Sequence, residues 1–104
     1  MNLKMGKGKL AAQVAHASLQ AFLNAEEHKR KMWLESGQKK VVLRVGSEEE
    51  LVRLYRKARR KGLKALMIRD AGLTQLQKGT ITAMAVGPEE EDKLDEVFGS
   101  LKLL

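Results

Sequence analysis

Four polar side chains near the N-terminus have the spacing of one helical face. Gln13, His16 and Gln20 follow Lys9 at offsets of four, seven and eleven residues, which places all four in a single stripe at 3.6 residues per turn. A lysine, an amide and an imidazole near a helix start, whose backbone N–H groups attract anions, could bind a phosphate or a developing oxyanion. The alternative is an ordinary solvated face with no ligand.

A second group of reactive side chains lies in the stretch Asp70-Ala71-Gly72-Leu73-Thr74-Gln75 and continues to Thr82. A carboxylate, hydroxyl groups and an amide follow a predicted strand here, and α/β proteins place ligands beyond strand ends. Asp70 is equally suited to forming a turn, and threonine is an ordinary residue of turns and strands. These residues alone leave both interpretations open.

The sequence contains no motif that indicates nucleotide binding, a serine nucleophile or a metal site. The Gly6–Lys9 stretch is not a P-loop, because Leu10 stands where that motif needs Ser or Thr. There is no GxSxG nucleophile motif. Two histidines and no cysteine argue against a structural zinc site, so we predict neither a metal nor a cofactor.

The elements that must position these residues alternate between helix and strand. A basic loop, Met5–Lys9, leads into a first helix whose apolar stripe should bury against a sheet; that stripe comprises Leu10, Val14, Ala17 and Ala21. Further helices are predicted over 26–35, from Ser47 to Gly62, and from Pro88 to Gly99, and strands over 41–45, 65–68 and 81–86. We therefore expect a single α/β domain, residues 1–104, with helices on both faces of a small mixed sheet of three visible strands.

Charge narrows the class of partner. Twenty Lys and Arg against thirteen Asp and Glu give a net charge of +7, which favours a polyanion such as nucleic acid, although a basic surface without a ligand also fits. The absence of cysteine is compatible with a reducing compartment. No run is long enough to span a membrane and no signal peptide is apparent, so we expect a soluble, cytoplasmic protein.

Several blocks of the chain together resemble the type 2 peptidyl-tRNA hydrolase family in its archaeal style. The blocks are LKMGKGKLAAQVAHAS, GQKKVVL, DAGLTQ, GTITAMAVGP and GSLKLL, in that order across essentially the whole chain. The resemblance implies an enzyme that cleaves the ester between a peptide and the 3′ ribose of tRNA, recycling tRNA in translation. It also implies a four-stranded mixed sheet and a homodimer.

The resemblance also assigns candidate site residues. It implies catalytic roles for Lys9, Asp70, Thr74 and Thr82, with Gln13 and His16 in support. We expect substrate binding by Gln75 and by lysines that border the site, favoured over the basic cluster at 56–61: Lys4, Lys7, Lys39 and Lys40.

Two departures from the family pattern matter. Members usually carry a strand ending in aspartate before the KMGKGK block, whereas this chain begins Met1-Asn2. The resemblance therefore implies either a sheet one strand short or another element that takes the place of this strand. Lys78 stands where the family usually has proline. The alternative function is a catalytically silent tRNA- or RNA-binding module, whose site is misassembled because the first strand is missing.

Overall fold

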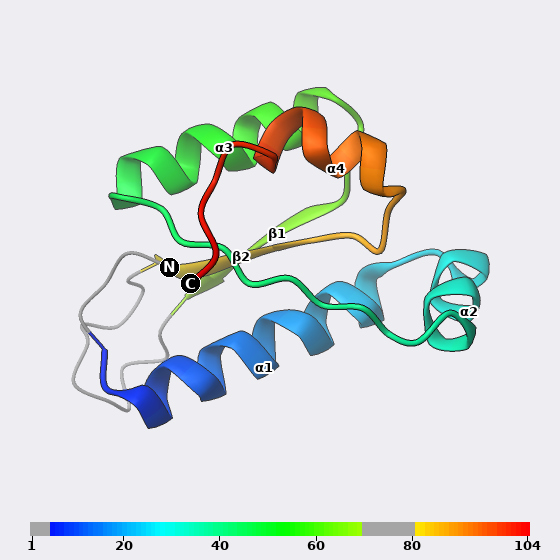
Figure 1. Ribbon diagram of the computed structural model, residues 1–104, viewed down its shortest axis with the longest axis horizontal. Helices are drawn as coiled ribbons and strands as arrows, with labels where there is room; N and C mark the ends of the chain where they lie inside the picture. The colour runs from blue at the N-terminus through cyan, green and yellow to red at the C-terminus, as the bar shows by residue number, and fades with distance from the viewer. Residues whose placement is uncertain (1–4, 70–80) are drawn as a thin grey trace.

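The computed structural model describes residues 5–69 and 81–104. Its elements follow the order α1 (Lys7–Asn24), α2 (Glu27–Glu35), α3 (Glu48–Arg60), β1 (Ala65–Arg69), β2 (Ile81–Val86) and α4 (Glu91–Phe98). β1 and β2 form a two-stranded antiparallel sheet. Figure 1 shows α1 on one face of this sheet and α3 with α4 on the other, so the predicted α/β class with helices on both faces holds.

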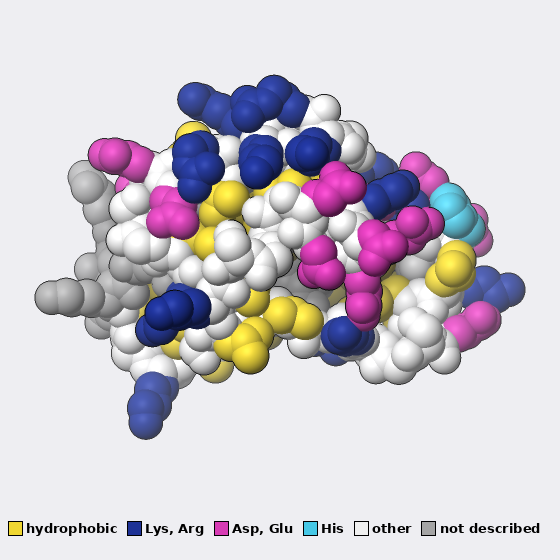
Figure 2. Space-filling model, turned by 45° about the horizontal axis from the view of Figure 1, so that its top comes forward, with side chains coloured by type: hydrophobic (Ala, Val, Ile, Leu, Met, Phe, Trp, Pro, Cys, Tyr) yellow, Lys and Arg dark blue, Asp and Glu magenta, His cyan; other side chains and the backbone are white. Residues whose placement is uncertain are grey.

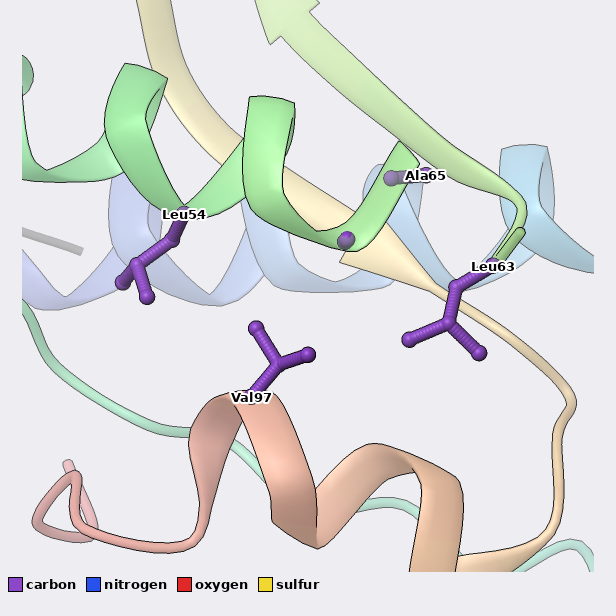
Figure 3. Close-up of a cluster of buried hydrophobic side chains, with 5 residues drawn as sticks. Leu54, Leu63, Ala65 and Val97 are labelled. Carbon is purple, nitrogen blue, oxygen red and sulfur yellow. The ribbon is translucent and has the colours of Figure 1, made fainter. Parts of the chain in front are cut away.

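The larger part of the core fills the layer between the sheet, α3 and α4. Leu54, Leu63, Ala65 and Val97 are buried there, and Figure 3 shows Leu54 of α3 and Val97 of α4 pointing toward each other. Ala58 is fully buried in the same cluster, where its small side chain lets α3 approach the sheet closely. This layer fixes β1 and β2 from one side.

A smaller apolar cluster holds α1 against the opposite face of the sheet. Ala17 of α1 packs with Ile68 of β1 and Ala83 of β2, joined by the partly buried Ala85. The predicted apolar stripe of α1 is therefore the face that meets the sheet, although Leu10, Val14 and Ala21 stay half-buried. The contact is made by small side chains, so α1 lies close to the strands.

The predicted start of the first helix was wrong. The sequence suggested a flexible loop over Met5–Lys9, but α1 already begins at Lys7, with Gly6 as its N-cap. The backbone N–H of Leu10 bonds the Gly6 carbonyl oxygen at 2.9 Å, which closes the first helical turn. Lys7 and Lys9 consequently sit on the first turn of a helix and not on a loop.

The signals that bound α3 are confirmed. The Ser47 hydroxyl accepts a hydrogen bond from the Glu50 backbone N–H at 3.1 Å, as in an N-terminal cap. Glu50 Oε2 in turn accepts from the Gly46 N–H at 3.1 Å. The helix gives way at Gly62, whose φ of +81° lies in the left-handed region that glycine adopts without a steric penalty.

The predicted strand over 41–45 is not a member of the sheet. Within the described part of the chain this segment makes one isolated bridge, between Leu43 and Leu103. Its backbone pairs with the C-terminal tail: the Arg44 N–H bonds the Lys102 carbonyl oxygen and the Leu104 N–H bonds that of Val42, both at 3.0 Å.

A groove is lined by both the segment 41–45 and β2. It has a volume of about 810 Å³, and its lining includes Val41, Val42, Leu43 and Val45 as well as Ala83–Val86 of β2. A strand of a sheet needs a backbone ladder with its neighbour, and the described residues show none between this segment and β2. The expected three strands are thus two among the described residues, and the ladder between these two is antiparallel.

The last helix also begins later than predicted. Pro88 does not start α4, whose first residue is Glu91 and whose N-cap is Glu90. Gly87–Glu90 instead forms the connection out of β2, in which Glu89 pairs with Lys29 of α2. The expected stop at Gly99 is confirmed, because Gly99 is the C-cap of α4.

Candidate active site

A buried polar contact joins α1 to the sheet at Gln13 and Thr82. Gln13 Nε2 donates to Thr82 Oγ1 at 2.7 Å, and the Thr82 hydroxyl donates to the backbone carbonyl oxygen of Ile68 at 3.2 Å. Thr82 is 0% exposed, whereas Gln13 is half-buried. The hydroxyl is therefore satisfied both as acceptor and as donor, as burial of a polar group requires.

A β-bulge accounts for the direction of the Thr82 side chain. Ile68 pairs with Ala83 and Arg69 pairs with Ile81, so Thr82 is an extra residue on β2 without a partner on β1. Ala83 faces α1, and regular alternation would turn Thr82 to the opposite face. The bulge interrupts that alternation and allows the hydroxyl to meet Gln13.

Lys9 lies one helical turn before Gln13 on the same face of α1. It is half-buried and takes part in interactions with other residues of the protein. No side chain caps this helix end and its first turn contains no acidic residue. The positive end of the helix dipole thus coincides with two lysine charges, an arrangement suited to an anion.

The remaining members of the polar stripe lie away from this contact. His16 is exposed, and Gln20 lies two turns beyond Gln13, about 10 Å along the helix axis. Lys7 is exposed and borders a groove along the outer side of α1, which it shares with Lys40. Of the residues in the predicted stripe, Gln13 is therefore the one that forms the polar contact with Thr82 of the sheet.

Lys39 and Lys40 have their own partners in the structure. Lys39 Nζ lies 2.7 Å from Glu91 Oε1, and this hydrogen bond raises the pKa of Lys39 and lowers the pKa of Glu91. Lys40 Nζ lies 5.0 Å from the centre of the Trp33 ring and donates to the Gln38 carbonyl oxygen. Neither lysine is brought to Gln13 or Thr82 by these contacts.

The basic cluster on α3 is a separate surface. Figure 2 shows Lys and Arg side chains in a row along the α3 side of the molecule, with acidic side chains gathered nearby over α4. α3 packs on the face of the sheet opposite α1. This cluster is therefore remote from the Gln13–Thr82 contact.

Several predicted site residues lie outside the described residues: Lys4, Asp70, Thr74 and Gln75, together with Lys78. Arg69 and Ile81, the described residues that flank the segment 70–80 in the chain, pair with each other in the sheet. Both residues are next to Thr82 in the strand register. Roles for Asp70, Thr74 and Gln75 remain predictions.

The described residues define a hydrogen-bonding site and offer no metal cluster. In residues 5–69 and 81–104, no group of three or more His, Asp or Glu side chains could hold a metal ion. Over the same ranges, no helix has the length and apolar character needed to cross a membrane. The arrangement can bind an anion at the start of α1 and orient one amide beside it.

Comparisons with known proteins agree with the resemblance seen in the sequence. The family model described as "Peptidyl-tRNA hydrolase PTH2" matches residues 1–104. The chain is 53% identical to the peptidyl-tRNA hydrolase of Methanocaldococcus jannaschii, over 99% of this chain and 92% of that protein. Proteins of the same name from Methanopyrus kandleri and Haloquadratum walsbyi are 53% and 49% identical, over 99% and 98% of this chain and 90% and 91% of their own lengths. This chain belongs to the PTH2 peptidyl-tRNA hydrolase family.

Proposed function

We propose that this protein hydrolyses the ester between a peptide and the 3′ ribose of tRNA, which returns tRNA from aborted translation to use. The observation that carries this proposal is the Gln13–Thr82 contact beside the basic start of α1, in a chain whose relatives bear the name of this activity. The site joins a place for an anion to a fixed hydrogen-bonding amide.

The reaction sets three requirements. Water must add to the ester carbonyl carbon, the negative charge on the carbonyl oxygen must be stabilised, and the 3′ oxygen of the ribose must leave and take up a proton. The products are a free peptide carboxylate and a tRNA with a 3′ hydroxyl. Each step uses positioning, charge and proton transfer, which side chains can supply.

Four residues take the catalytic roles in this proposal. Lys9 offsets the charge on the oxyanion or holds the terminal phosphate of the tRNA. Asp70 orients or deprotonates the water, directly or through Thr74. A carboxylate with an ordinary pKa near 4 is a weak base, so orientation is the larger part of its role. Thr82 has a positioning role, because its hydroxyl oxygen accepts the hydrogen bond that Gln13 Nε2 donates.

Other side chains hold the tRNA backbone and the peptide. We assign this role to Gln75 and His16 and to four lysines: Lys4, Lys7, Lys39 and Lys40. The exposed position of Lys7 and Lys40 on one groove supports it, because a polyanion can reach both. Lys39 contributes less in this arrangement, since Glu91 compensates its charge.

The first experiment measures cleavage of N-acetyl-aminoacyl-tRNA and of free aminoacyl-tRNA by the purified protein. We expect cleavage of the blocked substrate, and a loss of about a hundredfold or more in turnover for Lys9→Ala and Asp70→Asn. Asp70→Asn should bind tRNA with near-normal affinity. Lys31→Ala, which removes an exposed lysine from α2, is the matched control for loss of charge.

The outcomes of this experiment are distinct. Cleavage of the blocked substrate that both substitutions abolish supports the hydrolase. Full turnover by Asp70→Asn would show that Asp70 does not have the catalytic role proposed for it. Binding of tRNA without any cleavage would favour the silent RNA-binding module.

The protein also acts as a homodimer in this proposal. Leu19 of α1, Leu34 of α2 and Leu104 of the tail are exposed by 44–54% of their surface and border the same groove as Lys7 and Lys40. In this proposal a second copy covers the apolar side chains of the groove and leaves the two exposed lysines at its rim to the tRNA. Exposed apolar side chains that share one groove are suited to a protein interface, and twofold symmetry would let one such surface cover itself. Light scattering should give the mass of two chains, and Leu19→Glu should give that of one.

Two further parts of the proposal concern the chain as a whole. We infer that residues 1–104 act as a single domain, because α1 packs on one face of the sheet while α3 and α4 pack on the other. We also infer that the protein works in the cytoplasm, where its tRNA substrate is used.

A further inference from the structure

The hydrogen bonds at Thr82 run in one direction. A backbone carbonyl oxygen can only accept, so the single hydroxyl proton of Thr82 goes to Ile68. Thr82 Oγ1 is then the acceptor for Gln13, which must present its NH₂ group to it. Gln13 therefore donates to Thr82, and Thr82 donates to the carbonyl oxygen of Ile68.

This direction fixes the orientation of the Gln13 amide. Because Nε2 is held at Thr82, the amide oxygen Oε1 points away from Thr82 and has no hydrogen-bond partner among the described residues. Gln13 is half-buried, whereas Thr82 is 0% exposed. A bound molecule can therefore reach Gln13 but not the Thr82 hydroxyl.

We propose that Gln13 presents Oε1 as a hydrogen-bond acceptor to a donor group of the bound substrate, and that Thr82 is a positioning residue that acts only through Gln13. The donor is an N–H or O–H group close to the ester, one helical turn from Lys9. The inference rests on the proposed hydrolase function. It adds to that proposal which of the two side chains contacts the substrate: Gln13 does, and Thr82 does not.

A double-mutant cycle on kcat/KM tests this relation. Thr82→Val removes the hydroxyl at nearly constant volume, and Gln13→Ala removes the amide. Each should lower kcat/KM by about three- to tenfold, the range of one hydrogen bond. The double variant should be no worse than the poorer single variant, because Thr82 has nothing to position once the amide is gone.

Two further variants separate positioning from a purely structural role. Thr82→Ser keeps the hydroxyl and should restore kcat/KM to within about twofold of the unmodified protein. Gln13→Glu introduces a carboxylate that cannot donate to Thr82 when ionised, so its kcat/KM relative to the unmodified protein should rise as the pH falls toward 5 and the carboxyl group takes up a proton. Gln20→Ala, an amide two turns away on the same helix, is the matched control.

NMR provides a readout independent of activity. The side-chain ¹⁵N–¹H resonances of Gln13, assigned by their loss in Gln13→Ala, should shift toward those of exposed glutamines in Thr82→Val and keep their positions in Thr82→Ser.

These measurements separate this inference from the hydrolase proposal. Additive losses in the double variant, or Thr82→Ser as poor as Thr82→Val, would overturn the inference while the hydrolase stands. If the unmodified protein cleaves no peptidyl-tRNA, the hydrolase proposal is wrong, and so is the contact between Gln13 and the substrate that depends on it. Unchanged Gln13 resonances in Thr82→Val would overturn the hydrogen-bond chain itself.

Discussion

At the scale of single residues, the protein relies on a few polar pairs whose partners lie far apart in sequence. Gln13 and Thr82 connect α1 to β2, and Lys29 and Glu89 connect α2 to the turn that follows β2. The Glu89 side chain is only 5% exposed, while that of Lys29 is 36% exposed. A nearly buried carboxylate depends on its partner far more than an exposed one does.

Lys29→Met should therefore destabilise the fold. We expect a loss of about 1–3 kcal/mol in the free energy of unfolding at pH 7, because Glu89 is left buried without its cation. Urea titration measures this loss. Lys31→Met, at an exposed site on the same helix, should change it by less than about 0.5 kcal/mol.

The same pair predicts a pH dependence. The hydrogen bond to Glu89 raises the pKa of Lys29 above its ordinary value of 10.5; burial opposes this effect, and the negative charge of Glu89 adds a smaller increase. The folded protein thus holds this proton more tightly than the unfolded chain does. The stability advantage over Lys29→Met should be complete below pH 10.5 and shrink as the pH rises through the raised pKa. An advantage that grows in that range would contradict the assignment.

At the scale of elements, some helices are bounded by local sequence signals, whereas others are stabilised mainly by tertiary contacts. α3 is bounded by its own sequence, with Ser47 as the cap at one end and Gly62 at the other. α1 has no side-chain cap and is held by its contact with the sheet. The first kind of helix can be weakened from its end, whereas the second depends on its buried face.

Ser47→Ala should weaken α3 through its cap. The substitution removes the acceptor of the Glu50 N–H, and we expect a loss of about 1 kcal/mol in the free energy of unfolding. Ser100→Ala, at an exposed position beyond α4, provides the control and should have almost no effect. Equal losses for both variants would mean that the Ser47 cap contributes nothing specific.

At the scale of the whole molecule, charge is the property most relevant to tRNA. The net charge of +7 is not spread evenly, because acidic side chains gather over α4 while one row of basic side chains follows α3. Lys7 and Lys40 border the groove on the α1 side, away from α3. Binding of the tRNA backbone should therefore distinguish these two basic surfaces.

We expect tRNA affinity to fall steeply between about 50 and 200 mM salt, because phosphate contacts release counterions. The Lys7→Gln/Lys40→Gln double variant should flatten the dependence of log Kd on log salt concentration by up to about two units of slope. Arg56→Gln/Arg60→Gln, which removes two charges from α3, is the matched control. A larger change of this slope in the α3 variant would mean that tRNA binds on the face of α3 and not on that of α1.

The sequence by itself determined the family, the four helices found among the described residues, the signals that bound α3 and the helical spacing of a polar stripe on α1. These features depend on neighbouring residues or on long blocks of sequence, which can be read without knowledge of distant contacts. Only the tertiary structure decided which member of the stripe meets the sheet and that Val41–Val45 pairs with the tail at Leu103. It also decided the bulge that turns Thr82 toward Gln13, because a bulge depends on the register between two strands and no single strand encodes that register.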